Sequence, residues 1–411
     1  MRRGAEGQPA LAAGARSVKR TLAAFLVSLF AVAASPIRAA EDAYEINILL
    51  PLTGPIAFLG KTELLTVQLA EKVINARGGI KGRPVKFVVS DDTSSPQVAV
   101  QLTSAIAAKK VPVILGSPLA ASCAAMGPLV AKTGPVQYCL APVIHPAAGS
   151  FVFATGVSSV ESALVLARYF KAKGLTRVAI ITATDATGQD MDAAFNAVFG
   201  MAENKALTVV AREHFTPSDL SVAAQMSRIK AAAPHVLVTW TIGTPFGTVV
   251  QGIRDAGLEI PVSAAQGIML YAQLAQLAGI LPKELIFPGY RSLSPSDVRP
   301  GPIHDQQKIM YDAYRTTGAR PDIGAATTWD PILIVVDALR ALGTDASAEA
   351  VRAHIAGLHG FAGVNGIYDF RDGSQRGVGA SALVIDRWNA ATSEFTAISK
   401  PGGGLRAAAR F

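Results

Sequence analysis

Residues 74–100, INARGGIKGRPVKFVVSDDTSSPQVAV, constrain the fold more than any other stretch of this chain. Apolar residues at helical spacing lead up to Gly78 and Gly79, which supply the left-handed conformation that commonly ends a helix. Residues 85–89 form an apolar run of strand length, and two aspartates follow it. Pro96 then suits the first turn of another helix. The stretch predicts an α/β protein with a loop at the carboxyl end of a strand.

The same alternation of strand and helix signals continues along the chain. Strands are expected at residues 44–50, 85–90, 111–115, 136–140, 177–182, 207–211, 235–240 and 260–264. A helix over 159–173 separates the first four strands from the last four, residues 303–342 are expected to be mainly helical, and 382–388 to be extended. Repeated βα units produce parallel sheets with helices on both faces. The fold class is therefore α/β, with two similar lobes that each contain a doubly wound parallel sheet.

The amino terminus has the pattern of a secretory signal peptide. Residues 1–38 carry six basic residues and one acidic residue, and 22–34 form an uncharged apolar run. That run is shorter than the roughly 20 apolar residues that a membrane span needs, although a retained anchor is the alternative. Cleavage near Ala39 or Ala40 would make residues 1–40 the signal peptide. No lipid-acceptor cysteine stands there, so the mature protein is expected to be free in the periplasm.

Charge and motifs exclude several functions. The net charge is +8, of which the signal segment accounts for five, so the mature chain keeps about +3. Without an arginine-rich run, interleaved basic and aromatic residues or zinc spacing, nucleic-acid binding is not expected. Nucleophile elbows, phosphate loops and metal motifs are also missing from the sequence, and the run Gly402 to Gly404 is followed by no Lys-Ser or Lys-Thr. We expect neither an enzyme nor a cofactor or metal site.

Two motifs resemble one known family. The run from Asn75 to Gly82, followed by an extended segment, two aspartates and Pro96, is similar to the periplasmic Leu/Ile/Val-binding proteins, and so is the PLTGP loop at 51–55 with Gly60. These are type I solute-binding proteins of ABC transporters for hydrophobic amino acid uptake. The resemblance extends from about residue 46 onward and is strongest before 156.

The resemblance implies the domain organisation and the partner. Two lobes would be joined by three crossings, near residues 156, 290 and 345. Lobe 1 would then comprise residues 41–157 and 291–345, and lobe 2 residues 158–290 and 346–411. The expected function is that of a monomeric binding component that closes on a small solute and delivers it to a membrane permease.

Ligands of open parallel sheets bind beyond the carboxyl ends of the strands, where helix N-termini can receive a carboxylate. The expected contact residues follow the strands or match family positions, and they are Phe58 (or its neighbour Leu59), Leu119, Ala120, Ser122, Ala141, Pro142, Val143, Thr187, Trp240, Thr241, Ile242, Gln266 and Trp329. For the tryptophans a place in the core is the alternative, and for the serine a role in helix capping. Asp91 and Asp92 are expected to be structural.

Several of these positions depart from the family pattern. Ala120 stands where the family has a serine for the ligand carboxylate, Ile242 where it has a tyrosine, and residues 141–143 where it offers an alanine and threonine pair. Gln266 replaces the acidic residue that neutralises the ammonium group. A buried ammonium without a paired charge is costly, so the resemblance and its departures favour a small hydrophobic carboxylate, such as an aromatic acid. The alternatives are uptake of branched-chain or other hydrophobic amino acids, or a ligand-sensing lobe pair that feeds a membrane receptor.

The chain contains two cysteines, Cys123 and Cys139. An even count in a secreted protein favours one disulfide, and two buried free thiols are the alternative. A catalytic thiol is disfavoured because His145 is the only nearby base in the sequence.

Overall fold

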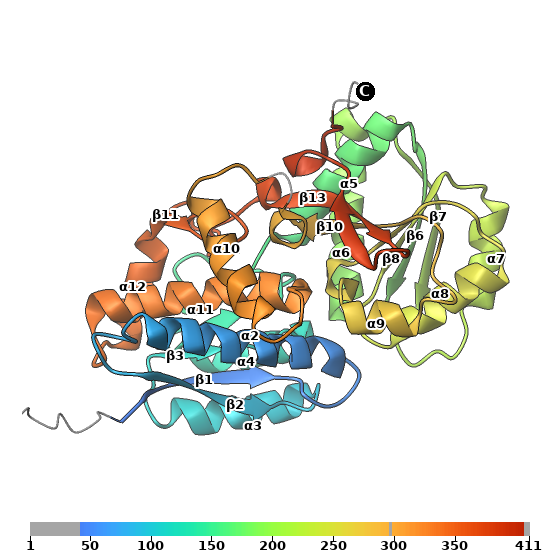
Figure 1. The fold of residues 1–411 in the computed structure, drawn as a ribbon. Helices are drawn as coiled ribbons and strands as arrows, with labels where there is room; N and C mark the ends of the chain where they lie inside the picture. The colour runs from blue at the N-terminus through green and yellow to red at the C-terminus, as the bar shows by residue number, and fades with distance from the viewer. Residues whose placement is uncertain (1–41, 296–297, 407–411) are drawn as a thin grey trace, which may run out of the picture. The chain divides into compact units, whose positions relative to one another are not determined.

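The computed structural model describes residues 42–295 and 298–406, so the expected signal peptide lies outside the described residues. The first of two large sheets has the strand order β2-β1-β3-β4-β5, and all of its neighbouring strands run parallel (Figure 1). Its strands are β1 (Tyr44–Leu50), β2 (Val85–Asp91), β3 (Val113–Leu115), β4 (Val136–Cys139) and β5 (Val152–Ala154). Four of these confirm expected strands, whereas β5 was not predicted.

The second sheet has the order β14-β13-β10-β9-β8-β6-β7. Its parallel part consists of β6 (Arg177–Ala183), β7 (Thr208–Phe215), β8 (Val236–Trp240), β9 (Val262–Ala264) and β10 (Leu285–Tyr290). The strands β13 (Leu383–Asn389) and β14 (Glu394–Ala397) then add an antiparallel edge. The expected parallel sheet is confirmed, and the antiparallel edge is a feature that the sequence pattern did not reveal, because the run at 382–388 was read only as extended.

Helices follow the parallel strands, as the βα pattern predicted. They are α2 (Ala57–Ala76), α3 (Pro96–Ala107), α4 (Ala120–Val130), α5 (Ser159–Lys173), α6 (Ala186–Phe199), α7 (Ala223–Ala231), α8 (Pro245–Asp255), α9 (Tyr271–Gln276), α10 (Pro302–Arg315), α11 (Ile323–Leu342) and α12 (Ala348–Gly357). The helix α5 has the bounds expected from the sequence because both ends carry strong signals: a capping box of Ser158 with Glu161, and left-handed Gly174 at the end. Within the described residues, none of the helices is long and apolar enough to cross a membrane.

The carboxyl-terminal third of the chain packs on both sheets. In Figure 1 the orange helix α11 lies beside the blue helix α2 of the first lobe. Val351 and Ile355 of α12, and Tyr368 and Phe370 beyond it, are also buried in the hydrophobic core of the first sheet. The chain contributes to the core of the second sheet again from Ala382 onward.

This packing differs from the expected boundary near residue 345, which assigned residues 346–411 to lobe 2. The apolar face of α12 is buried against the first core, so the third crossing lies between Phe370 and Ala382. Residues 371–381, RDGSQRGVGAS, contain three glycines and two serines, which is a linker-like signal at this place that was not used in the prediction.

Two of the crossings touch each other at Gly156 and Tyr290. The Tyr290 hydroxyl is buried and accepts a hydrogen bond from the backbone N–H of Val157, at 3.2 Å. Gly156 has φ +67°, and a Cβ at this position would lie 2.0 Å from the Tyr290 hydroxyl oxygen. A side chain at 156 would therefore both strain the backbone and displace the tyrosine.

We expect Gly156→Ala to destabilise the protein by at least about 2 kcal/mol, because overpacking adds to the backbone strain. Gly174→Ala is the matched control, since Gly174 has a similar φ of +72° with no heavy atom within 4 Å of the added Cβ. The control should lose only about 1 kcal/mol. Urea unfolding measures both losses, and equal losses would contradict a tight contact between the crossings.

Candidate functional site

A pocket lies where the carboxyl ends of the strands in both sheets meet. Counted with its opening to solvent, it holds about 560 Å³ of empty space. Its wall comes from the loops after β3, β4, β6, β8 and β9 and from the first turns of α2, α5 and α11. The lining residues are Leu59, Pro118, Ala120, Ala141, Pro142, Val143, Val157, Ser159, Thr187, Trp240, Ile242, Ala265, Gln266, Gly267, Ile323 and Thr327.

The wall of this pocket is apolar and uncharged. Among the described residues that line the pocket, none is charged. The polar side chains among them are those of Ser159, Thr187, Gln266 and Thr327. Trp240 is 3% exposed and is held by an edge-to-face contact with Phe195, with ring centroids 6.2 Å apart. Such a surface suits a small, largely apolar ligand that a few polar groups orient.

Most of the expected contact residues meet in this pocket. Eight of them line it: Ala120, Ala141, Pro142, Val143, Thr187, Trp240, Ile242 and Gln266. Five of them do not: Phe58, Leu119, Ser122, Thr241 and Trp329. Contact of the eight with a ligand stays a prediction.

The geometry of the elements explains why five of the expected residues do not line the pocket. Ser122 lies two residues beyond Ala120 on α4 and therefore points to another side of that helix. Trp329 likewise lies two residues beyond Thr327 on α11, and it is fully buried in the first core. Thr241 stands between the lining residues Trp240 and Ile242, and successive side chains of an extended chain point to opposite sides. Phe58 and Leu119 adjoin lining residues but do not line the pocket themselves.

Seven further residues line the pocket and were not among the expected contacts: Pro118, Val157, Ser159, Ala265, Gly267, Ile323 and Thr327. Two signals could have found some of them. Ile323 and Thr327 have the i, i+4 spacing of one helix face, and Ser159 is the first residue of a helix that was predicted with its correct bounds.

The start of α4 has no side-chain cap. Its N-cap, Leu119, makes no side-chain capping bond, no acidic residue lies in its first turn, and the Leu119 N–H donates to the Ser117 hydroxyl at 3.2 Å. The start of α2 is also without a side-chain cap, whereas α5, α6 and α11 are capped by Ser158, Asp185 and Asp322. The first N–H groups of a helix carry partial positive charge and need acceptors. The pocket therefore offers hydrogen-bond donors at α4, next to the lining residue Ala120.

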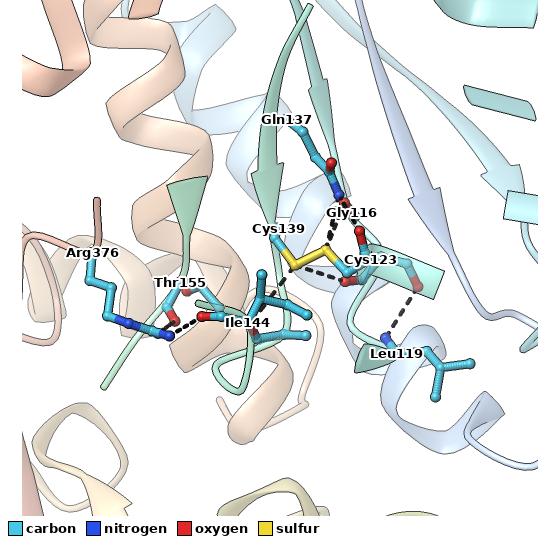
Figure 2. Close-up of a disulfide and its surroundings, with 10 residues drawn as sticks. Gly116, Leu119, Cys123, Gln137, Cys139, Ile144, Thr155 and Arg376 are labelled. Carbon is cyan, nitrogen blue, oxygen red and sulfur yellow. Dashed lines mark hydrogen bonds between the residues drawn. A yellow bond between two sulfur atoms is a disulfide. The ribbon is translucent and has the colours of Figure 1, made fainter. Parts of the chain in front are cut away.

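A disulfide between Cys123 and Cys139 holds this part of the wall, with Cα atoms 6.0 Å apart (Figure 2). The expected bridge is thus confirmed, and with both cysteines bonded a free catalytic thiol is excluded. Gln137 donates a hydrogen bond from Nε2 to the Cys123 carbonyl, at 3.0 Å. Together these bonds fix the first turn of α4 against the end of β4, from which the lining loop at 141–143 continues.

The paired aspartates after β2 are structural, as expected. The Asp91 carboxylate accepts hydrogen bonds from Leu52 N and Thr93 N at 2.9 and 2.8 Å and from the Thr53 hydroxyl at 2.8 Å. Burial acts to raise the pKa of Asp91, but these hydrogen bonds outweigh it and lower the pKa. Asp91 thus ties two loops together, and neither Asp91 nor Asp92 lines the pocket. Throughout residues 42–295 and 298–406, no group of His, Cys, Asp and Glu side chains is arranged to hold a metal ion.

A buried acid caps α11 beside the pocket. Asp322 is 4% exposed and accepts a hydrogen bond from Gly324 N at 3.0 Å. Burial raises the pKa of Asp322 to about 7, although hydrogen bonds from Gly324 and Thr62 oppose the shift. The folded protein therefore holds this proton at pH values where the unfolded chain releases it, and the resulting stability is lost as the pH rises toward 7.

We expect Asp322→Asn to make the free energy of unfolding less dependent on pH. Asparagine can keep the cap, but it does not titrate. The variant should match the wild type near pH 4 and exceed it at pH 8 by up to a few kcal/mol, at about 1.36 kcal/mol per unit of pKa shift. Urea unfolding at both pH values tests this, and a constant difference between variant and wild type would contradict it.

The sequence matches the periplasmic binding protein family over residues 43–392, which is most of the chain. The chain belongs to this family.

Relatives and solved structures agree with this assignment. A Leu/Ile/Val-binding protein homolog 3 from Brucella melitensis is 28% identical over 233 residues, which is 54% of this chain and 61% of that relative's length. An extracellular ligand-binding receptor from Rhodopseudomonas palustris HaA2 has a similar fold, with a TM-score of 0.76, 21% identity and coverage of 87% of this chain and 100% of the other. A solute-binding protein of an ABC transporter from R. palustris, solved in complex with benzoate, has a TM-score of 0.70 at 18% identity, over 89% and 98% of the two chains. The likeness to these structures confirms the type I periplasmic binding protein fold.

Proposed function

We propose that this protein is the periplasmic solute-binding component of an ABC importer and that it captures a small hydrophobic carboxylate, such as an aromatic acid. The observation that carries the proposal is the uncharged apolar pocket between the ends of the two sheets, with the uncapped start of α4 in its wall. The lobes would close on the solute by a hinge motion, and the closed form would be recognised by the permease.

The first argument concerns the carboxylate. The N–H groups in the first turn of α4 have no capping side chain, and Pro118 and Ala120 put this turn in the pocket wall. Helix N-termini stabilise anions through these N–H groups and through the helix dipole. A carboxylate here needs no cationic side chain, and none is present in the wall.

The second argument concerns the rest of the solute. An amino acid also brings an ammonium group, whose burial without a paired carboxylate is costly. Gln266 lines the pocket at the position that aligns with the acidic residue of the resembled family, and its amide cannot neutralise a positive charge. The apolar side chains around it favour a hydrocarbon or an aromatic ring.

The relatives support solute binding but are divided over the ligand. The R. palustris neighbour holds benzoate, whereas the B. melitensis relative is a Leu/Ile/Val-binding protein homolog. Uptake of a branched-chain amino acid is therefore the second candidate function. Export through the expected signal peptide would place the protein in the periplasm, where relatives of this family act.

A thermal-shift comparison separates the two candidates. We expect benzoate to raise the melting temperature of the purified protein and leucine to have little effect. A ligand at about 100 times its dissociation constant stabilises a protein by about 2.7 kcal/mol, which such a measurement resolves easily. A clear shift with leucine, isoleucine or valine and none with benzoate would overturn the carboxylate proposal in favour of the amino acid.

The start of α4 can be tested directly with Ala120→Asp. The new carboxylate would occupy the helix N-terminus and repel a bound carboxylate, so we expect at least about a tenfold loss of benzoate affinity in calorimetry. Ala124→Asp is the control, because Ala124 is exposed one turn further along the same helix. Equal affinities of Ala120→Asp and the wild type would show that the carboxylate binds elsewhere.

A further inference from the structure

We infer that Ser159, held by Asp190, determines specificity by accepting a hydrogen bond from a hydroxyl group of the solute. The solute would then be a hydroxyl-bearing hydrophobic carboxylate. This inference rests on the proposed function and goes further, because it assigns a second polar group to the ligand and names the residues that recognise it.

The first observation is the direction of the Ser159 hydrogen bond. Ser159 is 4% exposed, begins α5 and lines the pocket. Its hydroxyl donates to Oδ2 of Asp190 on α6. The other carboxylate oxygen of Asp190 lies 2.5 Å from Nε2 of His145, in the loop after β4. An ionised carboxylate only accepts, so the single proton of Ser159 is committed and only its lone pairs remain for a ligand.

Two basic and two acidic side chains lie around Asp190 and its neighbours. His145, in the loop after β4, lies next to Asp190. Arg376 lies in the segment between Phe370 and Ala382, and its positive charge interacts with Asp190. The negative charges nearby are Glu161, which interacts with Arg376, and Asp372, which lines the same surface recess as His145 and Arg376. Figure 2 shows that the Arg376 guanidinium points toward the carbonyl oxygens of Ile144 and Thr155, to which it donates hydrogen bonds. Asp190 therefore has two basic side chains near it and accepts the hydrogen bond from Ser159.

Two further polar atoms of the wall are also acceptors. The Thr327 hydroxyl donates to the Ile323 carbonyl at 2.9 Å, so only its lone pairs remain, and the buried Glu63 carboxyl lies beside them. The Oε1 atom of Gln266 is buried and accepts no hydrogen bond from the described residues, although the Gln266 side chain lies beside the Tyr290 hydroxyl. A buried acceptor without a donor is costly, so Ser159, whose proton is committed, and Gln266 favour a ligand that brings a donor.

The absence of charged side chains from the pocket wall that the structure describes determines which hydrogen-bond donor of a ligand fits. The pocket has donors at α4 and acceptors at Ser159 and Gln266, but no carboxylate lines it. A neutral hydroxyl satisfies an acceptor without bringing a charge that needs a partner, whereas an ammonium group brings one. The polar groups therefore match a carboxylate and a hydroxyl on one small apolar framework.

Two series of solutes with matched carbon skeletons test the inference. The aliphatic series is 4-methylpentanoate, 2-hydroxy-4-methylpentanoate and leucine, and the aromatic series is benzoate with 3- and 4-hydroxybenzoate. In calorimetry, we expect a hydroxylated member to bind at least about tenfold more tightly than the unsubstituted acid of its series, because a site with a buried acceptor discriminates against the ligand that lacks the donor.

Three variants locate this preference in the structure. Ser159→Ala removes the acceptor and should reduce the affinity ratio of hydroxylated to unsubstituted acid to about one. Asp190→Asn should also reduce it, because an asparagine amide can donate to Ser159 and release the hydroxyl proton toward the pocket. Asp192→Asn is the matched control: Asp192 lies on the same helix but pairs with Arg212 and does not line the pocket, so the ratio should stay unchanged.

The outcomes separate this inference from the proposed function. If the acids bind but no hydroxylated member is preferred, or if Ser159→Ala keeps the wild-type ratio, the assignment of Ser159 is overturned and the carboxylate proposal stands. Tighter binding of leucine than of its hydroxy analogue would overturn the hydroxyl class. If no acid of either series binds, the proposed function itself fails.

Discussion

The contact between Gly156 and Tyr290 is the constraint on which the arrangement of the binding pocket depends. The chain leaves the first sheet at Gly156 and leaves the parallel part of the second sheet at Tyr290, and the Tyr290 hydroxyl accepts a hydrogen bond from the residue after the glycine. A side chain at 156 has no room there. Two chain crossings are thereby held together next to Val157 and Ser159, which line the pocket. The two chain crossings and the pocket wall thus share residues, as the proposed hinge motion would require.

None of the described side chains that line the pocket is charged, so polar groups alone would receive a charged solute. Positive potential comes from the open start of α4, and acceptors come from hydroxyl and amide oxygens whose orientation is set by bonds behind the wall. The ionisable groups stand one layer back: Asp190 holds Ser159, and Asp322 caps the helix that presents Ile323 and Thr327. Polar groups of fixed direction discriminate between ligands, because each unmatched polar atom loses its water without gaining a partner when the ligand binds.

Burial of acids beside the pocket has a cost in stability. Glu63 and Asp322 are nearly or fully buried on neighbouring helices, and burial raises the pKa of both carboxyl groups. Each group therefore favours the folded state at low pH and loses that advantage as the pH rises. The capping bond to Gly324 offsets part of the cost at Asp322 and fixes the start of α11 at the pocket.

The sequence by itself determined the class of fold, the strands of both parallel sheets apart from β5 and β10, the family and the loops that form the pocket. These follow from local signals, such as the capping box of α5 and the glycine stops, and from the rule that parallel strands end at one edge. Only the tertiary structure decided which side of α4 and α11 faces the pocket: Ser122 and Trp329 were expected there and do not line it, whereas Ile323 and Thr327 line it and were not expected. It also decided that α12 joins the first core and that Ser159 presents an acceptor. Such features depend on contacts between residues far apart in the chain, for which spacing along the sequence carries no information.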